Sequence, residues 1–123
     1  MKTFIIAGAV NAFLAVALGA FGAHGLEGKL EPKYMETWQT GVMYQMFHAL
    51  GLIAVGIIAG KLNASPLVSW TGWLMLAGII LFSGSLYVLS LSGIKVLGAI
   101  TPIGGVAFLA AWVLLIIAAV KYA

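Results

Sequence analysis

The sequence predicts an all-α integral membrane protein in which residues 1–123 form a single domain, a four-helix bundle with up-down-up-down topology. Three observations lead to this class. Hydrophobic residues make up 63% of the chain and charged residues only 7%, whereas a water-soluble domain carries about a quarter charged residues. The chain has four long uncharged stretches, and about 20 apolar residues span a bilayer. These stretches lack the alternation of a barrel strand, so helix is the structure that satisfies their backbone hydrogen bonds in lipid.

The four uncharged stretches have 21, 19, 33 and 25 residues, and they predict helices at about 3–23, 32–60, 67–92 and 96–121. The connections near 61–66, with Asn63 and Pro66, and near 93–96, with Gly93, are short. Short connections predict antiparallel neighbours. Met1, Lys2 and the first apolar stretch also resemble a secretory signal peptide, but a signal core has only about 7–15 residues. We therefore expect this stretch to be a span.

The segment EPKYMETWQTG, Glu31 to Gly41, predicts a short interfacial amphipathic segment before the second spanning run. Pro32 suits the first turn of a helix, where its missing N–H costs nothing. Tyr34 and Trp38 fall on one apolar face of this segment, so we expect both at headgroup depth. Among the other tryptophans, Trp112 lies too deep for an interfacial belt and is expected to be a packing residue. Trp70 and Trp73 are expected at the opposite interface.

Charge does not decide the orientation. Four spans put both termini on one side, here called side A, and the connections after the first and third helices on side B. Side A carries Lys2, Lys61 and Lys121, and side B carries Lys29, Lys33 and Lys95 with all three acids, Glu27, Glu31 and Glu36. The lysine counts are equal, so the positive-inside rule favours neither orientation. We expect the termini in the cytoplasm.

Charge and cysteine content exclude several classes of function. All six basic residues are lysine and the net charge is +3, which is not the basic stripe of a nucleic-acid-binding protein. The absence of cysteine excludes a disulfide, a thiolate metal site and a thiol nucleophile. No cofactor and no nucleic-acid partner are expected. The lipid bilayer is the expected environment, and a membrane protein partner or a homo-oligomer stays open.

Small residues predict close helix contacts. In the first helix they recur at spacings of three and four on one face, which suits tight packing in a membrane. Packing within the bundle or between protomers is favoured over a ligand groove. The members of this face are Gly8, Ala12, Ala15, Gly19 and Gly22. The last helix repeats the pattern with Gly98, Gly105 and Ala110, and Pro102 starts or kinks it. Four positions are likewise expected to be helix-packing residues: Gly84, Pro102, Gly104 and Gly105.

Polar side chains concentrate in the side B half of the bundle. Hydroxyl, amide and imidazole groups are costly in lipid unless they find partners, so they should turn inward and meet. Tyr44, Gln45 and His48 share a face of the second helix because they are three and four residues apart. We therefore expect a pocket in one leaflet, open towards side B. The candidates are His24, Tyr44, Gln45, His48, Ser83, Ser85, Tyr87 and Thr101.

Each candidate also has a purely structural interpretation. His48 suits a neutral hydrogen-bonding residue between helices, and His24 suits a cap on the carbonyl end of the first helix. The two histidines with Glu27 lack a tight metal-ligand motif, so no metal site is expected. Ser83 and Ser85 lack the strand-turn-helix elbow of a nucleophilic serine, so no catalytic residue is assigned.

Four ordered motifs resemble the DUF423 family of small bacterial four-helix membrane proteins, which is similar to the transmembrane protein 256 group. They are LGAFGAHGL (18–26), YQMFHALGL (44–52), LFSGSLYVLSLSG (81–93) and GAITPIGGVAF (98–108). The resemblance implies the fold and a location in the bacterial plasma membrane, but no activity. It implies recurrent positions at Gly22, His24, His48, Gly84, Ser85, Tyr87, Thr101, Pro102, Gly104 and Gly105.

We expect a non-enzymatic, multi-pass membrane protein that acts as a binding or accessory component through the side B pocket. One alternative is a structural subunit of a larger membrane complex whose glycine faces bind other helices. Another is a small proton- or ion-conducting element, because an imidazole in a span can relay protons. Against conduction, the spans contain no Asp, Glu or Arg to complete a path.

Overall fold

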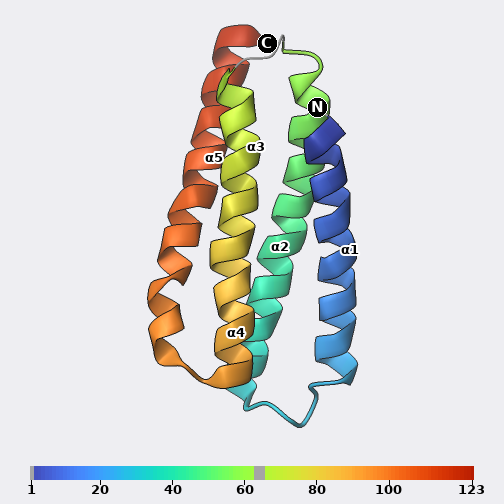
Figure 1. The fold of residues 1–123 in the computed structure, drawn as a ribbon, viewed down its shortest axis with the longest axis vertical. Helices are drawn as coiled ribbons and strands as arrows, with labels where there is room; N and C mark the ends of the chain where they lie inside the picture. The colour runs from blue at the N-terminus through green and yellow to red at the C-terminus, as the bar shows by residue number, and fades with distance from the viewer. Residues whose placement is uncertain (1, 63–65) are drawn as a thin grey trace.

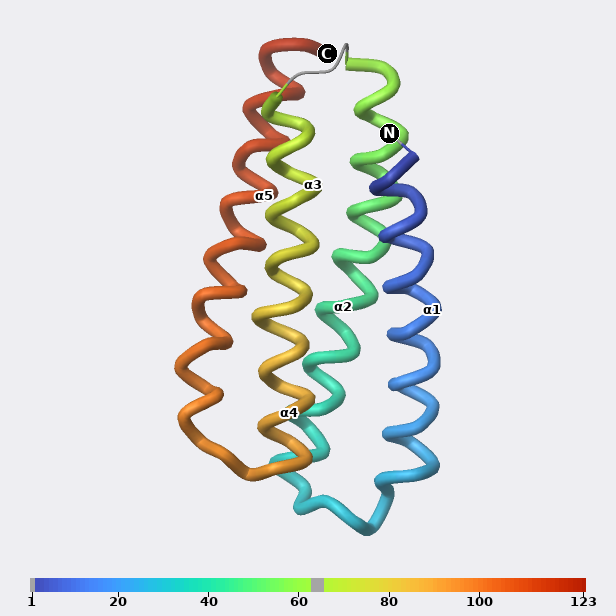
Figure 2. Tube along the Cα trace, in the orientation of Figure 1, coloured from blue at the N-terminus to red at the C-terminus, as the bar shows by residue number. Residues whose placement is uncertain are grey.

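In the computed structural model, which describes residues 2–62 and 66–123, four helical rods stand side by side with both chain ends at the same end (Figures 1 and 2). Each rod is long and apolar enough to cross a membrane, and the predicted all-α four-helix bundle is confirmed. Part of the 61–66 connection, including Asn63, lies outside the described residues. The elements are α1 (Lys2–His24), α2 (Pro32–Ala59), α3 (Pro66–Gly78), the π-helical turn η1 (Ile79–Ser83), α4 (Gly84–Ser92), the 3-10 turn η2 (Lys95–Ala99) and α5 (Thr101–Tyr122).

The four rods form two closely packed pairs, α1 with α2 and α3 with α5. α1 packs on α2, and α5 packs on α3 and η1, while α2 joins the two pairs through α3, η1 and α4. In the view of Figure 1, α3 lies between α5 and α2. α5 therefore meets α2 mainly through large side chains. The buried core between the rods includes Phe4, Leu52, Val55, Val68, Met75, Ile79 and Phe108.

Helix ends follow local chemistry. Pro32 begins α2 at a position where no backbone N–H is needed. Gly93 ends α4 in the left-handed conformation (φ 71°), and its N–H donates to the Leu89 carbonyl at 2.8 Å, a common helix-terminating arrangement. Gly28 (φ 76°) turns the chain between α1 and α2. These glycines position both side B connections.

The π-helical turn η1 was not predicted, since the third span was expected as one regular helix over 67–92. It interrupts that rod at Ile79–Ser83, where one extra residue widens the helix, as π-turns do. Gly104 of α5 lies so close to this turn that an added Cβ would collide with the backbone nitrogen of Phe82. A side chain on Gly104 would therefore separate α5 from η1.

Trp38 is buried between α1 and α2, and its expected headgroup depth stays a prediction. α2 runs as one helix from Pro32 through Gly41, and Trp38 is only 3% exposed beneath α1. Its indole Nε1–H donates to the Leu18 carbonyl at 3.0 Å, and its ring lies 4.8 Å from that of Tyr87. Gly22 leaves the space for it, because a Cβ there would lie 2.5 Å from the indole nitrogen. Trp38 thus fastens α1 to α2.

The predicted small-residue face of the first helix packs within the chain. A Cβ on Gly8 would lie 2.6 Å from the Ala49 carbonyl oxygen, and one on Gly19 would lie 3.2 Å from Val42. Ala15 is 1% exposed and Ala12 is half-buried. This face is therefore the contact between α1 and α2.

Of the predicted packing residues in and before the last helix, Gly104 packs closely on η1, whereas Gly98 and Gly105 make no close helix contact within the described part of the chain. Gly98 has open space around it, and Gly105 comes no closer than 3.9 Å to the Phe82 ring. Gly84 likewise has open space where a Cβ would be, so it makes no close helix contact among residues 2–62 and 66–123. The face of α5 that packs is made by Gly104, Phe108, Ala111 and Ala118.

Candidate functional site

His48 and Trp112 form a hydrogen-bonded pair between α2 and α5. The Trp112 Nε1–H donates to His48 Nε2 at 3.0 Å. Because an indole nitrogen can only donate, Nε2 is the unprotonated ring nitrogen. His48 Nδ1–H then donates to the Tyr44 carbonyl at 2.8 Å, one turn earlier. Both nitrogens are engaged, so the pair requires the neutral imidazole.

Aromatic rings surround this pair. The His48 ring is stacked on Phe108, with centroids 3.5 Å apart and planes 12° apart. Tyr44 lies 4.5 Å from the Phe82 ring, which belongs to η1. α2, η1 and α5 each contribute to this ring cluster, so the π-helical turn brings Phe82 to the site.

A lateral groove of about 410 Å³ opens beside the ring cluster. Gly105 of α5 lies in its lining, and a Cβ there would come no closer than 3.9 Å to the Phe82 ring. Tyr44 is 38% exposed, and its hydroxyl has no hydrogen-bond partner in the described part of the chain. The lining residues are Tyr44, His48, Phe82, Pro102, Gly105, Val106, Phe108, Leu109 and Trp112.

A second set of polar side chains lies on the other flank of α2 and connects α4, α2 and α1 by hydrogen bonds. The Tyr87 hydroxyl donates to Gln45 Oε1 at 2.6 Å, and Gln45 Nε2 donates to Asn11 Oδ1 at 3.1 Å. Asn11 Nδ2 in turn donates to the Ala7 carbonyl at 2.9 Å. This chain joins α4 to α2 and α2 to α1, and it ends on a backbone carbonyl. It is a helix clamp rather than a lining of the groove.

The remaining predicted hydroxyl groups make contacts of their own. Ser83 Oγ donates to the Gly41 carbonyl at 2.7 Å and joins η1 to α2. Ser85 and Thr101 share a hydrogen bond of 2.6 Å that joins α4 to the start of α5. No buried side-chain nitrogen or oxygen lacks a hydrogen-bond partner among residues 2–62 and 66–123.

The candidates therefore do not form the one continuous cluster that was expected. Tyr44 and His48 line the groove, whereas Gln45 and Tyr87 belong to the clamp. His24 is exposed at the end of α1 and does not line the groove. Whether these residues bind a ligand stays a prediction.

Sequence reasoning missed three members of the site. Trp112 was expected only to pack, yet it supplies the hydrogen bond that holds His48. Phe82 and Phe108 carry no distinguishing signal in so apolar a chain. Asn11, which belongs to the clamp and not to the groove, is a further residue that the sequence analysis did not predict to contact Gln45. Its amide inside an apolar span was the available signal, because such a group must find a partner.

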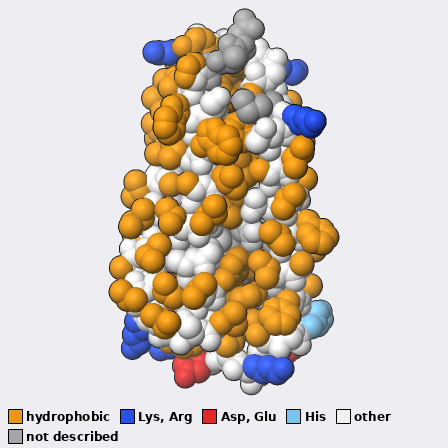
Figure 3. Space-filling model, viewed as in Figure 1, with side chains coloured by type: hydrophobic (Ala, Val, Ile, Leu, Met, Phe, Trp, Pro, Cys, Tyr) orange, Lys and Arg blue, Asp and Glu red, His pale blue; other side chains and the backbone are white. Residues whose placement is uncertain are grey.

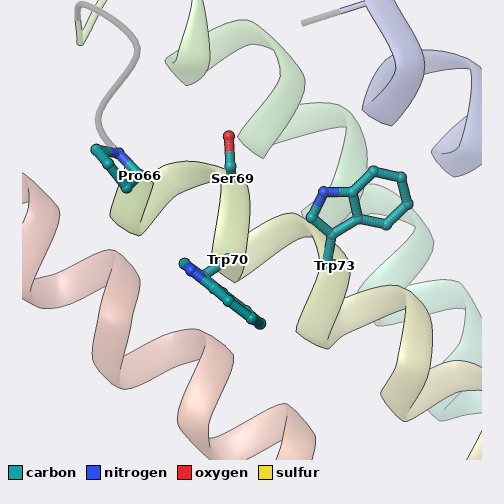
Figure 4. Close-up of a pocket in the computed structure, with 4 residues that line it drawn as sticks. All are labelled: Pro66, Ser69, Trp70 and Trp73. Atoms are coloured by element: carbon teal, nitrogen blue, oxygen red, sulfur yellow. The ribbon is translucent and has the colours of Figure 1, made fainter.

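Two other features were considered as functional sites, a surface hollow and a metal centre, and neither has converging side chains. A hollow of about 610 Å³ lies at the side A end of α3, lined by Pro66, Ser69, Trp70 and Trp73. Figure 4 shows the two indoles projecting from α3 in different directions, so they do not converge on a ligand. Within the described ranges, no three His, Cys, Asp or Glu side chains gather as metal ligands.

Comparison with known proteins defines the family. The family model described as "Protein of unknown function (DUF423)" matches residues 18–105. The chain belongs to the DUF423 family. The matched range runs from the last turns of α1 to Gly105 near the start of α5, so it includes all of α2 and η1 and five of the nine groove-lining residues.

Curated DUF423 relatives are membrane proteins of the same length. The chain is 62% identical over 122 residues to the UPF0382 membrane protein YwdK of Bacillus subtilis, covering 99% of each chain. It is 56% identical over 123 residues to a UPF0382 membrane protein of Staphylococcus epidermidis, covering 100% of this chain and 99% of the relative. No solved structure matches the chain. This DUF423 protein is therefore a bacterial multi-pass membrane protein.

Proposed function

We propose that this protein binds a small amphiphile from the bilayer in the groove between α2 and α5. The observation that carries the proposal is the aromatic groove around the His48–Trp112 pair, where the Tyr44 hydroxyl has no hydrogen-bond partner among the described residues. Pockets of roughly 300–1,000 Å³ with mostly apolar walls and few polar groups are typical of small-molecule sites. The ligand has an apolar body that packs on Phe108 and Phe82, and one polar group that meets Tyr44.

We infer a binding role rather than an enzymatic one. The two nitrogens of His48 are held by Trp112 and the Tyr44 carbonyl, so the imidazole is not poised to move a proton to or from a ligand. All three acidic residues, Glu27, Glu31 and Glu36, precede or begin α2 at its side B end. A catalytic partner for His48 would have to come from the ligand.

The alternatives have less support. The subunit hypothesis relied on the glycine face of α1, and Gly8, Gly19 and Gly22 are occupied by α2 within the chain. The conduction hypothesis needs a continuous polar path. Tyr87, Gln45 and Asn11 form a chain that ends on a backbone carbonyl, and His48 has other partners.

Gly105→Trp tests the groove. An indole at this position fills the space beside Phe82, so we expect the purified variant to lose a small molecule that wild type retains in mild detergent. Native mass spectrometry of the protein with its bound molecules gives the measurement. Val113→Trp is the matched control, because Val113 is 52% exposed on α5 and outside the groove, and it should retain the molecule. Equal retention by all three proteins would contradict the proposal.

We also infer a plasma-membrane location with side A in the cytoplasm. Side A combines three lysines with no acidic side chain, a balance that suits the anionic cytoplasmic leaflet. The chain has no cysteine, so single cysteines report topology cleanly. We expect an impermeant maleimide to label Glu27→Cys on intact cells and Gly60→Cys only after lysis. The reverse pattern would refute this orientation.

A further inference from the structure

The two ends of the bundle differ in charge composition. On the face in Figure 3, basic side chains appear at both ends, but acidic ones only at the side B end. The sequence explains this, because Lys2, Lys61 and Lys121 lie at the side A end and all the acids lie at the other. Side A therefore has three positive side chains and no negative one, whereas three glutamates offset the three lysines of side B.

A separate apolar groove of about 360 Å³ opens at the side A end between α2 and α5. Its lining includes the small side chains of Ala119 in α5 and of Ala123, which follows α5. Trp112, which reaches the Cβ position of Gly51 at 3.5 Å, precedes this part of α5. The lining residues are Ile58, Lys61, Leu62, Leu115, Ala119 and Ala123.

We propose that this side A groove binds an anionic phospholipid. Five of its six lining residues are apolar, and the sixth, the exposed Lys61, contributes its apolar stem to the lining, so the surface suits an acyl chain and has one cationic residue beside it. A lysine can lay its methylene stem along such a surface while its ammonium reaches the headgroup phosphate. The other side A lysines, Lys2 and Lys121, are exposed and add to the positive potential that attracts an anionic headgroup.

Competitive lipid retention tests this site. The protein is reconstituted into nanodiscs of equal parts phosphatidylglycerol and phosphatidylcholine, released into mild detergent, and analysed by native mass spectrometry. We expect wild type to retain phosphatidylglycerol in preference to phosphatidylcholine. Lys61→Gln should lower this preference about fivefold, the equivalent of about 1 kcal/mol per lysine near an anionic surface. Lys95→Gln removes the same charge on side B and should leave the preference unchanged.

A second pair of variants tests the apolar part of the groove without changing charge. Ala119→Trp fills the groove and should abolish the preference, whereas Val120→Trp, at a position 80% exposed on the same helix, should preserve it. Equal retention of both lipids by wild type, or an equal loss in Lys95→Gln and Lys61→Gln, would overturn the proposal. Displacement of the phospholipid by an equimolar free fatty acid would overturn the phospholipid assignment.

This site is independent of the proposed amphiphile groove. No residue is shared between the two linings, so Gly105→Trp should leave the preference for phosphatidylglycerol intact. Loss of the preference in Gly105→Trp would contradict the existence of two separate sites.

Discussion

We expect Gly104→Ala to lower the free energy of unfolding in detergent micelles by about 2–3 kcal/mol, the cost of forcing extra volume into a packed contact. The added methyl would meet the backbone of Phe82 in η1, and backbone cannot move aside as a flexible side chain can. Gly8→Ala should behave similarly, because its methyl would lie 2.6 Å from the Ala49 carbonyl oxygen. Reversible unfolding in mixed micelles, followed by circular dichroism, measures both changes.

Gly84→Ala provides the control with an effect of opposite sign. Gly84 is helical (φ −60°, ψ −46°) and has nothing within 4 Å of an added Cβ. Alanine is favoured over glycine in a helix by about 0.5–1 kcal/mol, so this variant should be more stable than wild type. If all three variants destabilise equally, the tight contacts of Gly8 and Gly104 do not determine the packing of α1 and α5.

We expect Gln45→Leu to lower the free energy of unfolding by about 2–3 kcal/mol. The substitution leaves the Tyr87 hydroxyl and Asn11 Oδ1 without their partner, and a buried polar group without a hydrogen bond costs about 1–3 kcal/mol. Tyr87→Phe removes only the outer member of the chain, so it should cost about 1 kcal/mol. The same unfolding titration measures both variants.

The double variant separates a connected clamp from independent contacts. In Gln45→Leu/Tyr87→Phe the unpaired hydroxyl is gone, so we expect the double variant to be no less stable than Gln45→Leu alone. Tyr122→Phe, at an exposed position near the end of α5, should match wild type. Strict additivity of the Gln45 and Tyr87 effects would show that the two side chains are not coupled.

Much of the fold could be predicted because a lipid environment restricts which backbone structures can span the membrane. Uncharged length alone places four spans, and the three- and four-residue spacing from Gly8 to Gly22 identifies the face that packs. The π-helical turn at Ile79–Ser83 could not be predicted, since inserting one residue into a helical turn changes neither composition nor apolar length. The burial of Trp38 depends on space left by Gly22 on another helix, so the amphipathic pattern around Trp38 does not reveal it.

The sequence predicted which polar residues of the candidate site are buried, but not how they are arranged around α2. The expectation that polar groups turn inward is correct for Gln45, His48 and Ser83, all of which are less than 7% exposed. Their division into two groups depends on angular position around α2 and on partners far away in sequence. Trp112 reaches His48 across 64 residues, and no local spacing connects them. His24 shares the residue type of His48 but lies exposed at the end of α1.

Photocrosslinking from α5 tests the groove most directly. A benzophenone amino acid is placed at Leu109, which lines the groove, or at Val113, which does not, and irradiated in native bacterial membranes. Mass spectrometry of the adducts should find one discrete amphiphile enriched at Leu109 and only the bulk lipid mixture at Val113. The same bulk mixture at both positions would contradict a specific ligand between α2 and α5.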